Sequence, residues 1–238
     1  NRQQTIQLLA PIIPYNKKAP KVEFAGSVSP RLDSRKSPEF ADVTISNTEG
    51  VTTSVSWKVA GIFTVMDGAN FNTRTDNLFL YSAFINYGTV KSAGLVDFNT
   101  PYHYAAAPPA HPFVFGQFES TGTLKFGGSG QVLLAGSSTP VLNNLVISNT
   151  KGITTTTLDT TGTYVLGIKD WVINGNLVIE GGGVLNAIPQ TSKTPLGTNF
   201  FIKGDLVNNG SIVSLIPGAA TPTPFGIGAN FTFSGTNS

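Results

Sequence analysis

The apolar residues of this chain come in groups of two to four, and each group is followed by a turn rich in asparagine and glycine. The clearest examples are Leu145-Val146-Ile147 before Asn149 and Gly152, Leu177-Val178-Ile179 before Gly181-Gly182-Gly183, and Leu206-Val207 before Asn208-Asn209-Gly210. Glycine and asparagine accept positive φ angles, so they can turn the chain between short strands at little steric cost. No segment longer than a turn or two has helical periodicity with caps. The pattern predicts an all-β protein.

A longer repeat contains this short motif. The segment from Pro38, PEFADVTISNTEGVTT, aligns without a gap with the segment from Pro140, PVLNNLVISNTKGITT, at an offset of 140 − 38 = 102 residues. The leucines that open the short motif are spaced by 177 − 145 = 32 and 206 − 177 = 29 residues. Each spacing fits one coil of a β-solenoid, in which asparagines at matched corners could stack as a ladder.

Two architectures fit these strands. One is a parallel β-helix or β-solenoid, in which stacked coils bury a narrow apolar seam. The other is a pair of tandem β-sandwich modules. Because the short motif recurs inside the long one, we favour the β-helix. The repeat divides the chain into an N-terminal arm (1–37), a first unit (38–139) and a second unit (140–238), which ends as a third begins.

Residues 96–117 have no counterpart in the second unit, and we interpret them as an insertion loop. This stretch is rich in proline and aromatic residues and contains both histidines of the chain. Binding residues often lie on loops carried by a rigid scaffold, so Tyr102, His103, Tyr104 and His111 are candidate ligand contacts. The alternative is that the loop only caps or packs on the core.

The arm is basic and contains proline. It contains seven lysines and arginines and two acidic residues, so its net charge is 7 − 2 = +5, whereas the whole chain carries +2. The basic residues are interleaved with prolines rather than stacking aromatics, so nucleic acid is not an expected partner. Proline withdraws ladder donors, which predicts an extended arm outside the repeat. Its apolar stretch from Ile6 to Ile13 would dock on an open end of the solenoid or on a partner protein such as export machinery.

Composition excludes several kinds of site. The chain has no cysteine and two histidines, and only 12% of its residues are charged, about half the usual share. We therefore expect no disulfide, metal or cofactor site, and no apolar run reaches the roughly 18 residues of a membrane span.

The acidic residues are scattered singly, so we predict no catalytic residues and no enzyme. Asp67 and Glu180 hold matching positions in a looser part of the repeat and could stack on one face, but each lies beside a glycine turn. Trp57 and Trp171 fall in roughly corresponding places in or beside strands. We expect them to pack in the core rather than to form an exposed sugar-stacking platform.

Three strings carry a family resemblance: GSGQVLLAGSSTPVLNNLVISNTKGI, WVINGNLVIEGGGVLNA and FFIKGDLVNNGSIV. They resemble repeats of large secreted proteins of the Bacteroidota, which are exported by the type IX secretion system and include gliding-motility proteins and surface adhesins. The resemblance covers most of residues 38–238. It implies a secreted, cell-surface location and O-glycosylation at Thr160 in Asp159-Thr160-Thr161. The sorting domain of exported members is missing, so we expect a part of a larger chain or assembly.

Together these observations predict a non-catalytic structural or adhesive segment of a large secreted cell-surface protein. Its partners would be secretion machinery or surface glycans. The alternatives are a carbohydrate-active β-helix enzyme, either a lyase or a glycosidase, and a segment of a viral or phage fibre.

Overall fold

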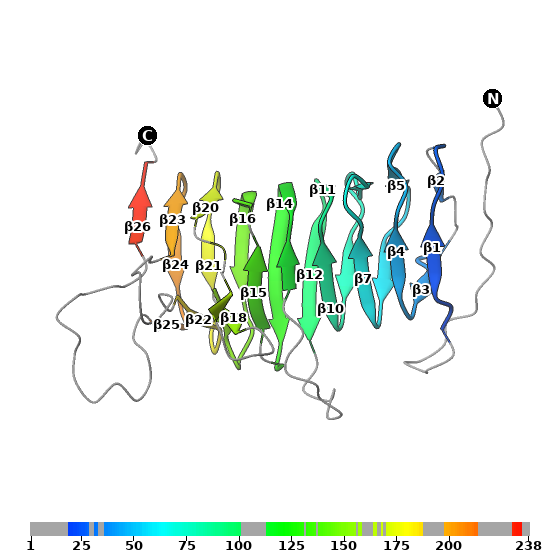
Figure 1. The fold of residues 1–238 in the computed structure, drawn as a ribbon. Helices are drawn as coiled ribbons and strands as arrows, with labels where there is room; N and C mark the ends of the chain where they lie inside the picture. Colours follow the sequence, from blue (N-terminus) through cyan, green and yellow to red (C-terminus); the bar gives the residue numbers. More distant parts are fainter. Residues whose placement is uncertain are drawn as a thin grey trace.

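The structure is a computed structural model that describes residues 19–28, 31–32, 36–100, 113–130, 132–136, 138–155, 157–158, 164–165, 168, 170–187, 198–213 and 230–234. These residues form 26 strands and no helix, so the prediction of an all-β protein is confirmed. No helix in the described part of the chain is long and apolar enough to cross a membrane. Figure 1 shows the strands side by side in chain order, from β1 at one end to β26 at the other.

Almost all strands belong to two sheets, and within both sheets the paired strands are parallel. The first sheet has nine strands: β1 (Val22–Phe24), β4 (Val43–Ile45), β7 (Ile62–Val65), β10 (Ala83–Asn86), β13 (Phe113–Phe115), β15 (Val132–Gly136), β17 (Ile153–Thr154), β22 (Val184–Asn186) and β25 (Ser211–Val213). The two remaining strands, β18 (Thr157–Leu158) and β19 (Tyr164–Val165), form a small antiparallel pair.

The second sheet has fifteen strands: β2 (Arg31–Leu32), β3 (Glu39–Phe40), β5 (Val51–Thr53), β6 (Trp57–Val59), β8 (Asn70–Asn72), β9 (Leu78–Leu80), β11 (Thr89–Ser92), β12 (Leu95–Thr100), β14 (Gln117–Gly128), β16 (Val141–Ile147), β20 (Asp170–Ile173), β21 (Leu177–Ile179), β23 (Asn199–Ile202), β24 (Leu206–Asn208) and β26 (Asn230–Phe233). The long strand β14 pairs with both β11 and β12, and a register shift between Ser120 and Thr123 divides its pairing with β16.

Each circuit of the chain adds one strand to the first sheet and two strands, or one long strand, to the second. The three strands β4, β5 and β6 pair with the next three, so that Val43 lies beside Phe63, Val51 beside Phe71, and Trp57 beside Leu78. Leu145, Leu177 and Leu206, which open the short motif in the sequence, are paired in register on β16, β21 and β24.

The core lies between the two sheets and follows from the alternation of apolar and polar residues. Along β7 and β9, for example, every second side chain is buried. Aromatic rings fill much of this interior, and several stack between neighbouring strands, as Phe98 does on Phe126 with ring centroids 5.2 Å apart. Trp57 and Trp171 are fully buried, so their predicted packing role is confirmed.

The two copies of the motif ISNTxG make the same turn. Asn47 and Asn149 are fully buried, and each lies three residues before a glycine with positive φ, 95° at Gly50 and 97° at Gly152. The Oδ1 atom of each asparagine accepts the N–H of that glycine, at 2.9 Å and 2.8 Å. Each Nδ2 donates to two carbonyls of the preceding circuit. The asparagine therefore closes its own turn and holds the neighbouring one.

A short side-chain ladder joins three circuits at the first residues of their strands, not at the asparagine and glycine corners where the sequence suggested one. Asp170, Asn199 and Asn230 are paired in register on β20, β23 and β26. Asn199 Nδ2 donates to Asp170 Oδ1 at 2.6 Å, and Asn230 Nδ2 donates to Asn199 Oδ1 at 2.9 Å.

Two predicted boundaries are wrong. The arm was expected to lie outside the repeat as far as residue 37, but β1 pairs with β4, β2 pairs with β5, and Phe24 is buried in the core. Lysines and arginines in this stretch hid an alternation of Val22 and Phe24 around Glu23, which is the pattern of a half-buried strand. The apolar stretch from Ile6 to Ile13 lies outside the described residues.

The insertion loop was expected to span residues 96–117, but both ends are strands. Val96 and Phe98 are buried in β12, and Phe113 and Phe115 are buried in β13. Proline and aromatic residues between these strands dominated the composition of the stretch and obscured the alternation at its ends. Residues 101–112 lie outside the described part of the chain.

Candidate functional site

A recess of about 440 Å³ lies at the corner where the chain passes from the first sheet to the second. Four successive circuits line it, through Asp67 and Gly68, Tyr87 to Thr89, Val114 to Gln117, and Ser138. The connections of the two middle circuits are short, Tyr87–Gly88 between β10 and β11 and Gly116 between β13 and β14. The flanking connections, residues 66–69 and 137–140, are longer. Two short corners between two longer ones produce the hollow.

Glycine is required at both short corners because neighbouring backbone leaves no room for a Cβ. A Cβ at Gly116 would lie 2.7 Å from the carbonyl oxygen of Asn86 and 2.9 Å from that of Gly88. At Gly88 it would collide with the carbonyl oxygens of Ala69 and Met66. These glycines let the middle circuits turn tightly, and the floor of the recess therefore depends on them.

Beside the floor lies a row of hydrogen-bonded polar side chains on β11 and β14. Thr89 Oγ1 donates to Gln117 Oε1 at 3.2 Å, and Gln117 Nε2 donates to Glu119 Oε1 at 3.0 Å. Lys91 Nζ lies 3.3 Å from Glu119 Oε2. The hydrogen bond from Gln117, followed by that from Lys91, lowers the pKa of Glu119 below its ordinary value. Glu119 is therefore ionised at neutral pH and fixes the orientation of the Gln117 amide.

A buried amide below this row has an acceptor with no hydrogen-bond partner. Asn86 is fully buried and lines the recess. Its Nδ2 donates to the carbonyl oxygen of Gln117 at 3.0 Å, whereas its Oδ1 accepts no hydrogen bond from any residue that the structure describes. Buried polar atoms are nearly always hydrogen-bonded, so this oxygen marks a place where a donor is missing.

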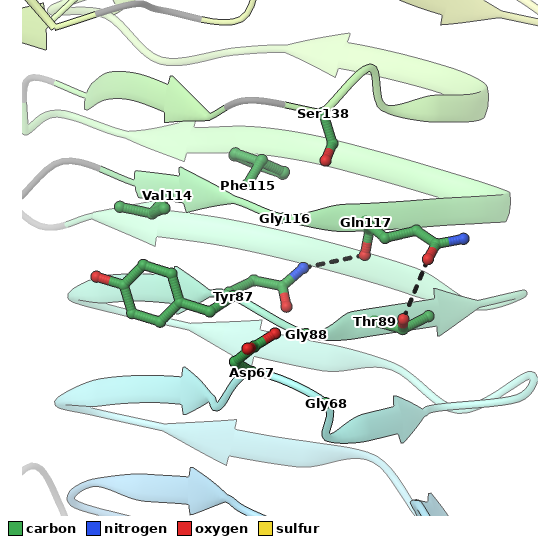
Figure 2. A pocket seen from close by; sticks show the side chains of 11 residues that line it. Asp67, Gly68, Tyr87, Gly88, Thr89, Val114, Phe115, Gly116, Gln117 and Ser138 are labelled. Carbon is green, nitrogen blue, oxygen red and sulfur yellow. Dashed lines mark hydrogen bonds between the residues drawn. The ribbon is translucent and has the colours of Figure 1, made fainter. Parts of the chain in front are cut away.

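An exposed aromatic ring and a carboxylate complete the lining. Tyr87 is 58% exposed although its neighbours Asn86 and Gly88 are buried. In Figure 2 the Tyr87 ring lies on one side of the recess, Thr89 and Gln117 lie on the other, and Asp67 lies on the side of the preceding circuit. The arrangement offers one flat apolar surface beside several hydrogen-bonding groups, which is the general composition of a small-molecule site.

A second polar cluster lies on the outer face of the long sheet, on β12, β14 and the end of β21. Asp97 is paired in register with Lys125, and Lys125 Nζ lies 3.2 Å from Glu180 Oε2. Burial raises the pKa of Asp97 above its ordinary value, Lys125 opposes that rise, and Glu180 adds to it. The Asp97 Oδ1 atom is buried and has no hydrogen-bond partner within the described part of the chain. These three side chains are the nearest approach to a catalytic grouping in the described chain.

The structure separates the two acids that the sequence suggested might stack. Asp67 follows β7 of the first sheet, whereas Glu180 follows β21 of the second sheet. The looser alignment around these residues therefore matched strands of different sheets, and the expected stacking is wrong. No group of three or more His, Asp or Glu residues in the described ranges is placed to hold a metal ion.

The other candidate residues are not placed. Outside the described residues lie the candidate ligand contacts Tyr102, His103, Tyr104 and His111 and the candidate glycosylation residue Thr160. Sequence reasoning missed the recess, although one signal was present: Tyr87-Gly88 follows the apolar group Ala83–Ile85 at a turn, where an aromatic residue is not needed for the core.

Comparison of the chain with protein-family models, with curated proteins and with solved structures gave no match. The resemblance to secreted repeats of the Bacteroidota stays a prediction.

Proposed function

We propose that this chain is a segment of a parallel β-helix and that it serves as a non-catalytic structural or adhesive part of a large secreted cell-surface protein. The observation that carries the proposal is the in-register parallel pairing of successive circuits, which extends from β1 and β4 to β23 and β26. Sandwich modules are built from antiparallel strands, so this pairing favours the β-helix over tandem sandwiches.

Side-chain interactions between circuits support a structural role. Asp42 Oδ1 accepts the N–H of Ile62 at 2.9 Å, Asn144 Oδ1 accepts that of Asn176 at 3.0 Å, and Asn176 Oδ1 accepts that of Asp205 at 2.9 Å. Each of these bonds joins one circuit to the next at a corner. A stack held both by its backbone ladders and at its corners would resist bending and shear, as a surface rod must.

The outer face of the long sheet supports an adhesive role. Neighbouring parallel strands lie roughly 4.8 Å apart, so their outward side chains form regular rows. Lys91 and Glu119 form part of one row, and Lys58 and Glu39 form an ion pair in another, at 3.2 Å. A large surface with regular rows of side chains allows many weak contacts to act together, as adhesion requires.

Adhesion is tested with the purified chain coupled to beads. We expect the beads to be retained on cells or on extracellular polysaccharide more strongly than beads that carry the urea-unfolded chain. Equal retention would overturn the adhesive role, and turnover of any polysaccharide would overturn the non-catalytic one. The export route is tested in the encoding bacterium, where loss of the type IX system should remove the parent protein from the cell surface.

The cluster of Asp97, Lys125 and Glu180 favours a second candidate, a carbohydrate-active β-helix enzyme. A carboxyl group with a raised pKa beside a lysine and a second carboxylate is the kind of grouping that general acid–base chemistry uses. The test is a screen of polysaccharides for reducing ends released by the wild type and by Asp97→Asn. Activity that this substitution abolishes would establish the enzyme, and no release by the wild type would refute it.

A further inference from the structure

We propose that the recess between Asp67, Tyr87 and Gln117 binds one ring of a neutral saccharide. This inference rests on the proposed adhesive function, since it names the ligand that an adhesive surface would hold. It depends on three features of the described residues: an exposed aromatic ring, an array of uncharged hydrogen-bonding groups, and a buried acceptor with no donor.

The exposed ring provides the stacking surface. An aromatic side chain that is 58% exposed contributes little to the core, whose aromatic residues between the sheets are nearly all buried. The face of an aromatic ring is negative, and the C–H groups on one side of a pyranose ring are slightly positive and apolar, so the two surfaces attract. Tyr87 lies at the short corner between β10 and β11, and it lines the recess together with Asp67 of the preceding corner and Ser138.

The polar lining matches hydroxyl groups, which both donate and accept hydrogen bonds. Thr89, Gln117 and Ser138 are uncharged, and each can donate and accept. The Asn86 Oδ1 atom lacks a donor, and a sugar hydroxyl would supply one. The described lining includes one charged residue, Asp67, which accepts hydrogen bonds from hydroxyls.

The same lining disfavours the other common ligands. A phosphate or carboxylate would be repelled by Asp67, and the nearby Lys91 is engaged with Glu119. A purely apolar ligand would leave the polar groups of the recess without partners, which costs free energy. The volume of about 440 Å³ lies within the range of ligand-binding clefts, roughly 300–1,000 Å³.

The experiment is saturation-transfer-difference NMR on the purified full chain. The probes are the methyl glycosides of D-glucose, D-galactose, D-mannose and N-acetyl-D-glucosamine, each tested alone. We expect transfer to the ring C–H protons of at least one probe. Tyr87→Ala should weaken its binding about tenfold or more, whereas Tyr87→Phe should retain most of it because the ring remains. Asp67→Ala should also weaken binding.

The control is Phe201→Ala, which removes another exposed aromatic ring, 40% exposed, on a different part of the long sheet. It should bind as the wild type does, and far-UV circular dichroism should show that all variants are folded. If no probe receives saturation, or if Tyr87→Ala binds as well as Phe201→Ala, the saccharide site is refuted. Either result would leave the proposed adhesive role to its own test, because retention of the beads on cells is measured independently.

Discussion

Replacing Asn149 with alanine should destabilise the chain more than its small size suggests. The Asn149 side chain is fully buried and makes at least four hydrogen bonds to backbone groups. Two of them, at 2.8 Å each, reach the carbonyls of Gly127 and Gly130 in the preceding circuit. In the other two, Asn149 Oδ1 accepts the N–H groups of Lys151 and Gly152, at 3.0 Å and 2.8 Å.

The magnitude follows from the number of bonds. A hydrogen bond contributes about 1 kcal/mol net, so four of them predict a loss of about 4 kcal/mol in the free energy of unfolding. Asn47→Ala, in the matching turn, should cost less unfolding free energy, because the bond from Asn47 Nδ2 to the Ala25 carbonyl is 3.4 Å long. Asn47 Oδ1 also accepts the N–H of Gly50, but among the described residues it has no counterpart to the bond that Asn149 accepts from Lys151. Asn144→Ala removes one exposed bond, and about 1 kcal/mol or less is expected.

The assay is urea unfolding followed by tryptophan fluorescence. Trp57 and Trp171 are both buried, one in β6 and the other in β20, so Trp57→Phe and Trp171→Phe backgrounds report on different parts of the stack separately. We expect the order Asn149→Ala, Asn47→Ala, Asn144→Ala in decreasing loss. The assignment of this turn as the joint between circuits is wrong if Asn149→Ala lowers the free energy of unfolding by less than about 1 kcal/mol relative to its background. It is also wrong if the loss is no larger than that of Asn144→Ala.

Three further predictions concern packing, the corners and pH. Trp57→Ala should cost about 3–5 kcal/mol in unfolding free energy, because it opens a cavity among packed rings; a loss below about 1 kcal/mol would contradict this. Gly116→Ala should lower the melting temperature, since its Cβ would lie 2.7 Å from a backbone oxygen, whereas Gly181→Ala, with nothing within 4 Å, should leave it nearly unchanged. Because burial raises the pKa of Asp97, its ionised carboxylate costs stability, and the contribution of Asp97 to stability should fall as pH rises from about 3.9 through the raised pKa. Asp97→Asn should therefore melt higher than the wild type at neutral pH and alike at lower pH, and a lower melting temperature at neutral pH would contradict the burial argument.

The features that sequence reasoning predicted are those set within a few neighbouring residues. The turn ISNTxG contains its own explanation, because the asparagine side chain bonds to the glycine three residues later and the glycine needs positive φ. The stacking of Leu145, Leu177 and Leu206 was also accessible, since the same short motif opens at each of them. Local chemistry and a regular spacing were sufficient in both cases.

The features that it missed depend on contacts between circuits. Asp67 and Glu180 looked equivalent because each lies beside a glycine turn, yet the strands that precede them, β7 and β21, lie in different sheets. The number of residues in each corner varies along the chain, and a short local match does not show which sheet its strand joins. The recess could not be predicted for the same reason. It exists because the corners at Tyr87–Gly88 and Gly116 are shorter than the corners on either side.

The outer face of the long sheet shows why the fold was easier to infer than the function. Along one register row the outward residues change from Lys91 and Glu119 to Val141, Val172 and Phe201. The backbone pairing stays parallel throughout, so the ladder accepts a charged pair or a run of apolar side chains at equivalent positions. Inward residues have less freedom, because a polar side chain there needs a hydrogen-bond partner inside the stack, as Thr73 has in Ser92. Burial therefore preserves the alternation that identifies the strands. The outward residues, which meet any ligand, are left free to vary from one circuit to the next, and a repeat pattern says little about them.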